Sequence, residues 1–390
     1  MPHIVAKSYK EFETPKKQGE FQFLWFARPL KMASDKLVAV KRGDEEFLLE
    51  IKPKDDRYVI KGDKLTRISP LFVLKQALQA FCELAHCDVM HHNLSTIKPS
   101  HAAKAQEYYK DIEFFIQNFP KNKEVWIEVG FCSARHLLYQ AEQNPHIQFI
   151  GIEIHKPSIE QALKQIALRK LQNVLIVDYD ARLFLEFVPS NVVGKIFIHF
   201  PVPWDKKPHR RVISKKFIAE AKRVLKPGGV LELRTDSRLY FDYSLDLFLQ
   251  EPKVDLEVTK NMEPPITSKY EDRWLRLGKD IYDIRMIGHE ESEPIDLSYD
   301  FAFEPIEAEK ILRNFDNRPK VFEDYFVHFE KLYETSHGAL LLEVSFGSFD
   351  RPEHKYILFE KDRARYFPKK PVVSRANIAA HQKIKELLNE

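Results

Sequence analysis

Acidic residues lie at the ends of three successive apolar segments in this 390-residue chain. Glu128 lies in "VWIEVGF", Glu153 lies 25 positions later in "FIGIEI", and Asp180 follows "NVLIVDY". If these segments are neighbouring strands of a parallel sheet, their carboxyl ends meet at one edge, where ligands bind. A carboxylate about 20 residues beyond the first turn can accept hydrogen bonds from a ribose diol. A third carboxylate can accept from an adenine amino group, so the pattern indicates an adenosine-containing ligand, with Asp178 as the competitor of Asp180.

The turn after the first apolar segment reads "EVGFCSAR" and opens a predicted helix. Gly130 is its one glycine, and Cys132 and Ala134 are small residues that still allow a ligand to approach the backbone. A tight strand-to-helix turn without a ligand is the alternative interpretation. The sequence contains no G-x-x-x-x-G-K-[ST] motif, so it does not indicate a site for nucleotide phosphates.

The stretch "FIHFPVPWDKKPHRR" leads from an apolar strand into a cluster of positive charge. Between Trp204 and Lys226, nine basic and two acidic residues give a local net charge of +7, whereas the whole chain carries +3. Attraction to nucleic acid must therefore come from local clustering. We expect Lys206, Arg210 and Arg211 to contact phosphate groups, and we expect Trp204 to stack on a base.

A sheet must position these residues, and the order of elements after about residue 102 predicts one. Apolar strands alternate with amphipathic segments such as "SIEQALKQIALRKLQ" up to about residue 291. Continuous apolar strands separated by helices are typical of a mostly parallel sheet that is covered on both faces. We therefore predict an α/β, doubly wound domain over residues 102–291.

The regions on either side of this domain have a different pattern. Residues 1–68 contain short β-branched and aromatic runs between Gly, Pro and Asp residues, which predicts a β-rich N-terminal domain. Residues 69–101 predict a helix and a linker. Residues 292–390 contain three strand-like runs and a final polar helix, and we expect them to form a separate α+β domain.

Composition restricts the class of protein. The N-terminal segment has no apolar signal-peptide region, and no apolar run approaches the ~20 residues needed to span a bilayer. Three cysteines are too few for a disulfide framework and suit a reducing cytoplasm. The cluster "CELAHCDVMHHN" has no common zinc spacing, so we expect a helix end with surface histidines and no metal site. We expect a cytoplasmic protein without a membrane partner.

Several motifs in order resemble the bacterial tRNA (guanine-N7-)-methyltransferases. The resemblance covers residues 102–287, and the matching stretches are "EVGFCSA", "FIGIEIH", Asp180-Ala181, "FPVPWDKKPHRR", "FIAEAKRVLKPGG", "LRTD" and "SKYEDRW". It implies a methyltransferase core that uses S-adenosyl-L-methionine to methylate a guanine in the variable loop of tRNA. It also implies tRNA, and not DNA, as the partner. The resemblance does not cover the flanking domains, which we expect to extend the tRNA-binding surface.

The same resemblance implies roles for individual residues. The residues that would bind the cofactor are Glu128, Gly130, Glu153 and Asp180. The residues that would lie on the substrate side are Lys206, Asp236, Ser268 and Glu271, beside the Trp204, Arg210 and Arg211 singled out above.

The chain departs from the family pattern at the position generally treated as catalytic. The aspartate of F-P-D-P-W is Val202 here, and Pro208 replaces an arginine in a basic loop that is two residues shorter. Guanine N7 carries a free lone pair, so its methylation requires alignment and no general base. We interpret Val202 as a missing hydrogen-bond acceptor for the guanine N1–H and amino group. Its replacements would be carbonyl groups of the "PVPW" turn, Asp205 or Asp236.

We therefore expect an active methyltransferase. The alternative is a catalytically weak or inactive tRNA-binding protein on a methyltransferase core. Retention of Glu153, Asp180 and Asp236 argues against that alternative. A third class, a methyltransferase of small molecules, is disfavoured by the basic loop and by the "SKYE" motif.

Overall fold

The computed structural model of the chain forms two compact units. One unit consists of residues 1–98 and 298–390, and the other consists of residues 99–297. The structure describes residues 2–31, 35–68, 71–94, 107–267, 269–295, 298–361 and 363–390. Ser268, an expected substrate-side residue, lies outside this described part. No helix within these ranges is both long and apolar enough to cross a bilayer.

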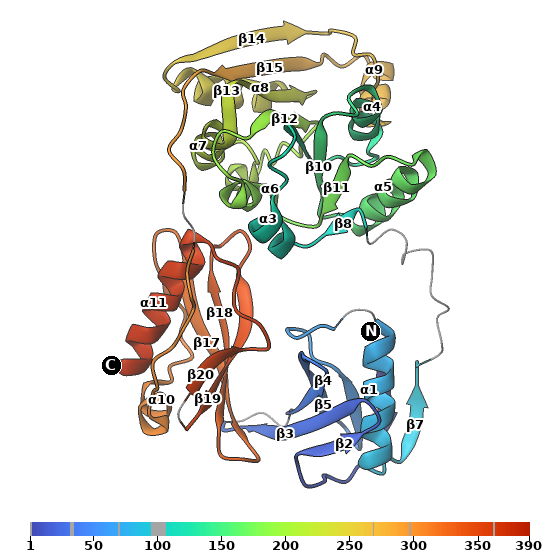
Figure 1. Ribbon diagram of the computed structural model, residues 1–390, viewed down its shortest axis with the longest axis vertical. Helices are drawn as coiled ribbons and strands as arrows, with labels where there is room; N and C mark the ends of the chain where they lie inside the picture. The colour runs from blue at the N-terminus through green and yellow to red at the C-terminus, as the bar shows by residue number, and fades with distance from the viewer. Residues whose placement is uncertain are drawn as a thin grey trace. The chain divides into compact units, whose positions relative to one another are not determined.

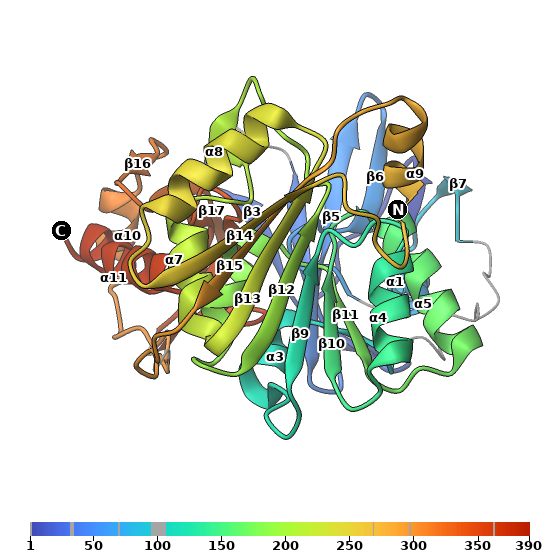
Figure 2. The same ribbon diagram turned by 90° about the horizontal axis from the view of Figure 1, so that it is seen from above.

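Among the described residues, eight strands form the sheet of the unit 99–297, in the order β14-β15-β13-β12-β9-β10-β11-β8 (Figure 2). The strands from β13 to β8 run parallel, and β15 and β14 continue the sheet antiparallel. Their bounds are β8 (Tyr109–Lys110), β9 (Val125–Val129), β10 (Gln148–Ile152), β11 (Val174–Val177), β12 (Val193–His199), β13 (Leu225–Thr235), β14 (Val254–Lys260) and β15 (Tyr282–Gly288). The predicted doubly wound, mostly parallel sheet is confirmed.

Helices connect the strands of this unit. They are α3 (Ile112–Asn118), α4 (Arg135–Gln143), α5 (Lys156–Arg169), α6 (Ala181–Phe184), α7 (Lys215–Val224), α8 (Arg238–Leu249) and α9 (Lys269–Arg276), with 3₁₀ turns η1 (Leu185–Phe187) and η2 (Pro208–Arg210). Ser214 and Ser237 cap α7 and α8, because their hydroxyl oxygens accept from backbone N–H groups in the first turn.

The two faces of the sheet carry different side chains, because successive residues of a strand point to opposite faces. Phe197 of β12 joins a buried cluster with α4 and α5 residues such as Leu137 and Ile166. Leu231 and Leu233 of β13 point to the opposite face, against which α7 and α8 pack. Glu232 and Arg234, which alternate with these leucines on β13, therefore point to the face of the sheet that α4 covers.

The unit formed by residues 1–98 and 298–390 contains a twelve-stranded sheet within the described ranges. Its strands are β1 (His3–Ala6), β2 (Lys16–Gln18), β3 (Phe21–Pro29), β4 (Lys36–Arg42), β5 (Glu45–Lys54), β6 (Arg57–Gly62), β7 (Val89–His92), β16 (Lys320–Val321), β17 (Phe326–Thr335), β18 (Leu340–Gly347), β19 (Glu353–Glu360) and β20 (Arg363–Phe367). Its helices are α1 (Leu71–Leu84), α10 (Ala308–Asn314) and α11 (Arg375–Asn389). The two chain ends thus build one unit (Figure 1).

This arrangement differs from the expected separate N-terminal and C-terminal domains. Strand β17 pairs antiparallel with β3, so one sheet runs through both regions. Trp25 and Leu48 also share a buried cluster with Tyr356 and Phe367. Alternation along each strand predicts the elements, but it cannot predict pairing between segments about 300 residues apart.

Two further clusters cover the outer faces of this unit. Residues of α1, such as Phe81, pack on the N-terminal strands. Residues of α11, such as Ile384, pack on the C-terminal strands, and Figure 1 shows α11 alongside β17 and β18. The unit therefore has four layers, with a helical layer outside each half of the sheet and the shared apolar cluster between the halves.

Candidate active site

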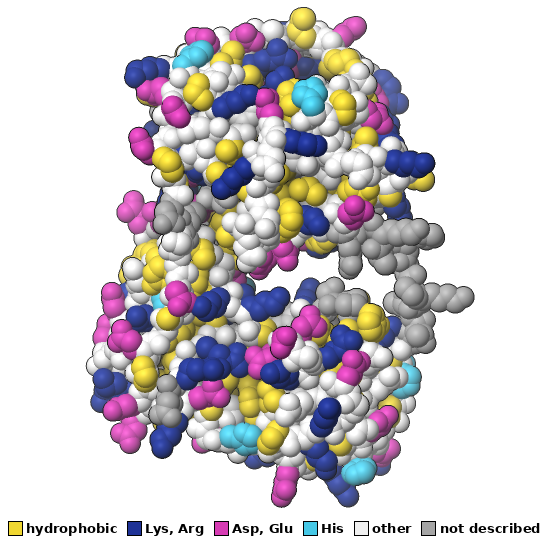
Figure 3. Space-filling view, in the orientation of Figure 1, with side chains coloured by type: hydrophobic (Ala, Val, Ile, Leu, Met, Phe, Trp, Pro, Cys, Tyr) yellow, Lys and Arg dark blue, Asp and Glu magenta, His cyan; other side chains and the backbone are white. Residues whose placement is uncertain are grey.

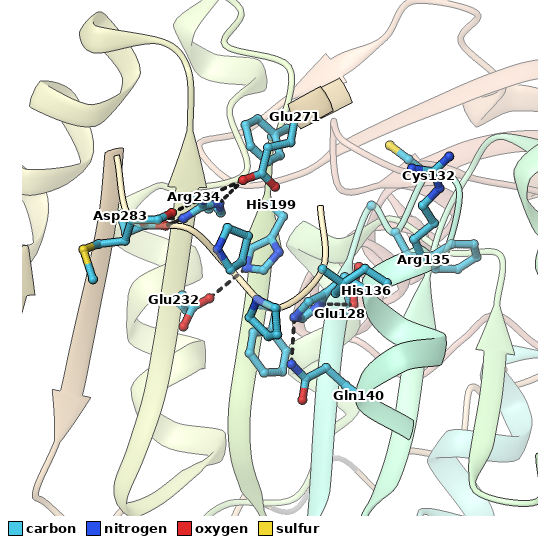
Figure 4. Close-up of a pocket in the computed structure, with 18 of the residues that line it drawn as sticks. Glu128, Cys132, Arg135, His136, Gln140, His199, Glu232, Arg234, Glu271 and Asp283 are labelled. Carbon is cyan, nitrogen blue, oxygen red and sulfur yellow. Dashed lines mark hydrogen bonds and ion pairs between the residues drawn. The ribbon is translucent and has the colours of Figure 1, made fainter. Parts of the chain in front are cut away.

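A cavity of about 320 Å³ lies at the carboxyl ends of β9, β12 and β13, on the α4 face of the sheet (Figure 4). Its wall includes Glu128 and Gly130, two of the four residues expected to bind a cofactor. Glu153 and Asp180, the other two, do not line it. The sheet therefore brings the first acidic residue and its turn to a cavity, as the sequence predicts, and places the other two carboxylates outside the cavity wall.

The turn between β9 and α4 has an unusual backbone. Gly130, Cys132 and Ala134 have φ values of 67°, 48° and 57°, in the left-handed region that favours glycine. The space around a β-carbon on Gly130 is open to a distance of 4 Å, so a ligand could approach its backbone. Burial, together with the charges of Glu153 and Glu128, raises the pKa of the Cys132 thiol to about 11. Cys132 is therefore protonated near neutral pH, which agrees with a small turn residue and not with a nucleophile.

Glu153 stabilises this turn through its carboxylate. One carboxylate oxygen accepts from the backbone N–H of Cys132 at 3.0 Å. The other accepts from the N–H groups of Ile154 and His155 at 2.9 and 3.0 Å. The carboxylate thus connects the end of β10 to the turn after β9, and the first oxygen keeps one lone pair that can receive a hydroxyl group.

Asp180 and its competitor Asp178 are both paired with basic side chains. Asp180 caps α6 and accepts from Arg182, whose Nη2 lies 2.6 Å from its carboxylate. Asp178 forms an ion pair with Lys156 at the start of α5. Either carboxylate would have to share or exchange its partner to contact an adenine amino group.

A histidine whose side chain is 13% exposed contacts Glu128 inside the cavity. Nδ1 of His136, the second residue of α4, lies 2.7 Å from a carboxylate oxygen of Glu128. Burial opposes protonation of His136, but the charge and hydrogen bond of Glu128 raise its pKa above the ordinary value. The His136 ring also lies 4.5 Å from the ring of His199, centre to centre.

His199 leads to a second set of charges on the same face (Figure 4). Its Nε2 lies 2.9 Å from Glu232 of β13, and Glu232 also accepts from Nε of Arg285 at 2.9 Å. Burial would raise the pKa of Glu232, but hydrogen bonds and charges from His199 and Arg285 lower it to about 2. Glu232 is therefore a fixed negative charge in the cavity wall.

Arg234 joins three segments at the cavity. Its Nη1 donates to both carboxylate oxygens of Asp283 on β15, at 2.6 and 2.7 Å. Its Nη2 donates to Glu271 of α9 at 2.5 Å and to the carbonyl oxygen of Met262 at 2.9 Å. Glu271, an expected substrate-side residue, is only 2% exposed and lines the cavity. Its carboxylate is bound to Arg234 and not directed into solvent.

The loop that follows β12 is exposed. Val202 is 61% exposed and Trp204 is 37% exposed, and the guanidinium of Arg210 lies 5.2 Å from the Trp204 ring centre. Lys206 and Arg210 are both exposed, as phosphate contacts require. Trp204 has a φ of 47°, so the loop presents its indole from a strained backbone.

Arg211 departs from its expected role as an exposed phosphate contact, because it is 7% exposed. Its Nε donates to the carbonyl oxygen of Pro203 at 2.7 Å, and its guanidinium lies over the Tyr240 and Tyr243 rings. It also contacts Asp205 at 3.5 Å. Arg211 therefore connects the loop after β12 to the aromatic rings of α8. Positive charge alone cannot reveal this, because the rings come from α8, about 30 residues later.

Asp205 and Asp236, the expected replacements for the acceptor at Val202, have basic partners. Asp205 is half exposed and contacts Arg211. Asp236 accepts from Nζ of Lys279 at 2.6 Å. Neither residue lines the cavity.

Sequence reasoning missed much of the cavity wall, notably His136, His199, Glu232, Arg234, Asp283 and Arg285. A signal was present, because "LELRT" places Glu232 and Arg234 at alternate positions of an apolar strand. Two charged residues on one face of a central strand indicate a polar site on that face.

The chain is similar to a known protein family and to several solved structures. Residues 122–284 match the Methyltransf_4 family, described as a putative methyltransferase. Among solved structures, an antibiotic-related methyltransferase is similar over 50% of this chain and 97% of its own length, with a TM-score of 0.35 and 19% identity. A 16S rRNA (adenine(1408)-N(1))-methyltransferase is similar over 52% of this chain and 96% of its own, with a TM-score of 0.34 and 18% identity.

Two curated relatives extend the similarity to the flanking regions. A protein of Wolinella succinogenes is 40% identical over 100% of both chains, and one of Helicobacter pylori is 41% identical over 100% of this chain and 99% of its own. Both are named tRNA (guanine-N(7)-)-methyltransferase. The unit formed by both chain ends is therefore shared with these relatives.

The doubly wound sheet, its antiparallel edge pair and the matching family model define a methyltransferase. Full-length similarity goes further, because it includes the flanking unit as well as the sheet. The chain belongs to the tRNA (guanine-N(7)-)-methyltransferase family.

Proposed function

We propose that the protein transfers a methyl group from S-adenosyl-L-methionine to N7 of a guanine in the variable loop of tRNA, in the cytoplasm. The observation that carries this proposal is the cavity at the turn after β9, in a chain that is 40% identical over its whole length to a protein named for this activity. Lys206 and Arg210 supply exposed positive charge on the loop after β12 for the tRNA backbone.

The residues around the turn fit the proposed cofactor. The open space at Gly130 admits a ligand against the backbone, and Glu153 retains a lone pair for a ribose hydroxyl. Glu128 lines the cavity as a buried carboxylate beside His136. Asp180 would reach an adenine amino group by exchanging its bond to Arg182. When bound, S-adenosyl-L-methionine supplies a methyl carbon on a positively charged sulfur.

The residues of the chain then orient the guanine. The N7 lone pair would form the new bond to the methyl carbon that S-adenosyl-L-methionine supplies, and the electron pair of the broken carbon–sulfur bond would stay on sulfur. No proton leaves N7, so the protein needs no general base there. Positive charge moves onto the guanine ring, and the fixed charge of Glu232 in the cavity wall would stabilise it.

Recognition of guanine must work without the family aspartate. The side chain of Val202 offers no acceptor, and Asp205 and Asp236 have basic partners. We infer that Trp204 stacks on the base, and that carbonyl groups of the 201–204 turn accept from the guanine N1–H and amino group. Asp236 could join them if Lys279 releases it.

A direct assay tests the proposal. Purified protein is incubated with S-adenosyl-L-methionine that carries a labelled methyl group and with unmodified tRNA, and the nucleosides are then separated. We expect label in 7-methylguanosine. No transfer at micromolar protein, with tRNA binding intact, would favour the alternative of an inactive tRNA-binding protein on a methyltransferase core.

A further inference from the structure

A segment between β14 and β15 covers part of the cavity. We call residues 261–267 and 269–276 the strap. Met262, Glu263, Pro264, Pro265 and Ile266 of the strap line the cavity, and so does Glu271. Since β14 and β15 are paired from end to end, the strap is a long connection that leaves the sheet edge and returns to it.

Buried contacts fix one side of the strap. Arg234 donates to Glu271 and to the carbonyl oxygen of Met262, and both Arg234 and Glu271 are buried. These contacts tie the strap to β13, in the sheet. They do not involve the turn after β9, where the cofactor is proposed to bind.

A separate ion pair connects the strap to that turn. Nη1 of Arg135 lies 2.8 Å from a carboxylate oxygen of Asp272 in α9. Arg135 is the first residue of α4 and directly follows Ala134, so it lies at the end of the strained turn. The two side chains are 47% and 40% exposed, so their ion pair lies at the surface and is not held in place by surrounding core residues.

The strap orients Asp272 toward this contact. The hydroxyl of Thr267 donates to Oδ1 of Asp272, which leaves Oδ2 for Arg135. The hydrogen bond from Thr267 and the nearby charge of Arg135 lower the pKa of Asp272. Within α9, Nε of Arg276 donates to the backbone carbonyl oxygen of Asp272 at 3.0 Å.

We propose that Arg135 and Asp272 are positioning residues that couple the cofactor turn to the strap. The inference rests on the proposed function of the cavity. A cofactor that orders the turn fixes the N-terminus of α4, and the ion pair passes this constraint to the strap. The wall that the strap contributes to the cavity is then ordered before the guanine enters, which lowers the cost of alignment.

The expected size of the effect is modest. Exposed ion pairs contribute about 0.2–1 kcal/mol, which corresponds to about a 1.5- to 5-fold change in an equilibrium. This coupling is reciprocal. If the cofactor stabilises the ordered strap by a given factor, the ordered strap raises the affinity for the cofactor by the same factor.

The test combines charge reversal with hydrogen exchange. Arg135→Glu, Asp272→Arg and the double variant with both changes are compared with the natural protein. Exchange in strap peptides is measured with and without S-adenosylhomocysteine, and kcat and KM for tRNA are measured at saturating S-adenosyl-L-methionine. Asp272→Asn removes the charge with little change in shape and serves if a reversal disturbs folding.

We expect S-adenosylhomocysteine to slow strap exchange in the natural protein, the single variants to lose that response, and the double variant to regain it. The single variants should raise KM for tRNA about two- to fivefold. The matched control is Arg169→Glu, which breaks the equally exposed Arg169–Glu142 pair between α5 and α4. It should change neither readout.

Two results would overturn the coupling: strap exchange that does not respond to S-adenosylhomocysteine in the natural protein, or single variants that respond as the natural protein does. Failure of the proposed function looks different. In that case the natural protein transfers no methyl group, while the exchange response and its loss in the single variants can still be measured.

Discussion

At the scale of single residues, the chain retains the charges around a methyl-transfer site but lacks one acceptor. Val202 is exposed on the loop after β12, where its methyl groups can only exclude water from a neighbouring base. In the cavity wall, Glu128 contacts His136, and Glu232 contacts His199 and Arg285, which lower the pKa of Glu232. We therefore expect the loss at position 202 to affect guanine recognition and not reactivity.

Restoring the acceptor should improve binding of tRNA. In Val202→Asp, a carboxylate can accept from the guanine N1–H and amino group, and a charged hydrogen bond contributes about 1.5 kcal/mol or more. KM for tRNA should fall about tenfold, with kcat within about twofold. The comparison with Val202→Thr, which adds no carboxylate, isolates the effect of charge. An unchanged KM in Val202→Asp would mean that another group already fills this role.

At the scale of elements, the ends of β12, β13 and β15 are joined by charged side chains as well as by the ladder. The alternation of strands and helices predicted the parallel sheet and the turn with Glu128 and Gly130. It could not predict the pairing of Arg234 with Asp283, because nothing local indicates that β15 returns antiparallel beside β13. Arg211 illustrates the same limit, since only the position of α8 makes it buried.

Removal of the central arginine should destabilise this group of elements. Arg234→Met removes the buried guanidinium that pairs with the carboxylates of Glu271 and Asp283, which costs about 3–5 kcal/mol. Hydrogen exchange of β13 and β15 amides during urea unfolding measures the loss for this unit. Arg238→Met, which breaks an exposed pair with Asp242, should stay within about 0.5 kcal/mol. Equal effects of the two variants would contradict a special role for Arg234.

At the scale of the whole molecule, residues 99–297, which form the mostly parallel sheet, are inserted in the sequence between two segments that together make the other unit. Basic and acidic side chains are interspersed over the surface in Figure 3, which agrees with the net charge of +3. The strands of both flanking regions were predictable from their β-branched and aromatic runs. Their union was not, because the contact between Tyr356 and Asp63 joins residues that are far apart in sequence.

The C-terminal layer of this unit should lose stability in mild acid. His381 of α11 is fully buried, contacts Tyr366 and the carbonyl oxygen of Ala302, and has a pKa that burial lowers to about 4. The unfolded chain, with an ordinary pKa near 6.5, binds the proton first as pH falls. Stability is thus complete above about pH 6.5 and decreases toward pH 4, by at most about 1.4 kcal/mol per pH unit.

Hydrogen exchange of α11 amides between pH 4 and 7.5, corrected for intrinsic rates, measures this dependence. His381→Gln cannot titrate, so its stability should be lower at neutral pH but should change less across the range. A natural protein whose α11 stability is constant from pH 6.5 to pH 4 would show that His381 is not the titrating group.

The pairing of β17 with β3 also determines when the molecule can be completed during synthesis. The first 98 residues leave the ribosome with the apolar side of Trp25 and Leu48 uncovered, and the segment that holds their partner strands begins only after the 199 residues of 99–297. At about 5–20 residues per second, that interval is about 10–40 s. During this interval the nascent chain exposes the apolar face of a half-sheet, which residues 298–390 must later cover. A premature stop near residue 298 would leave this surface permanently open, which makes such fragments substrates for chaperones or proteases.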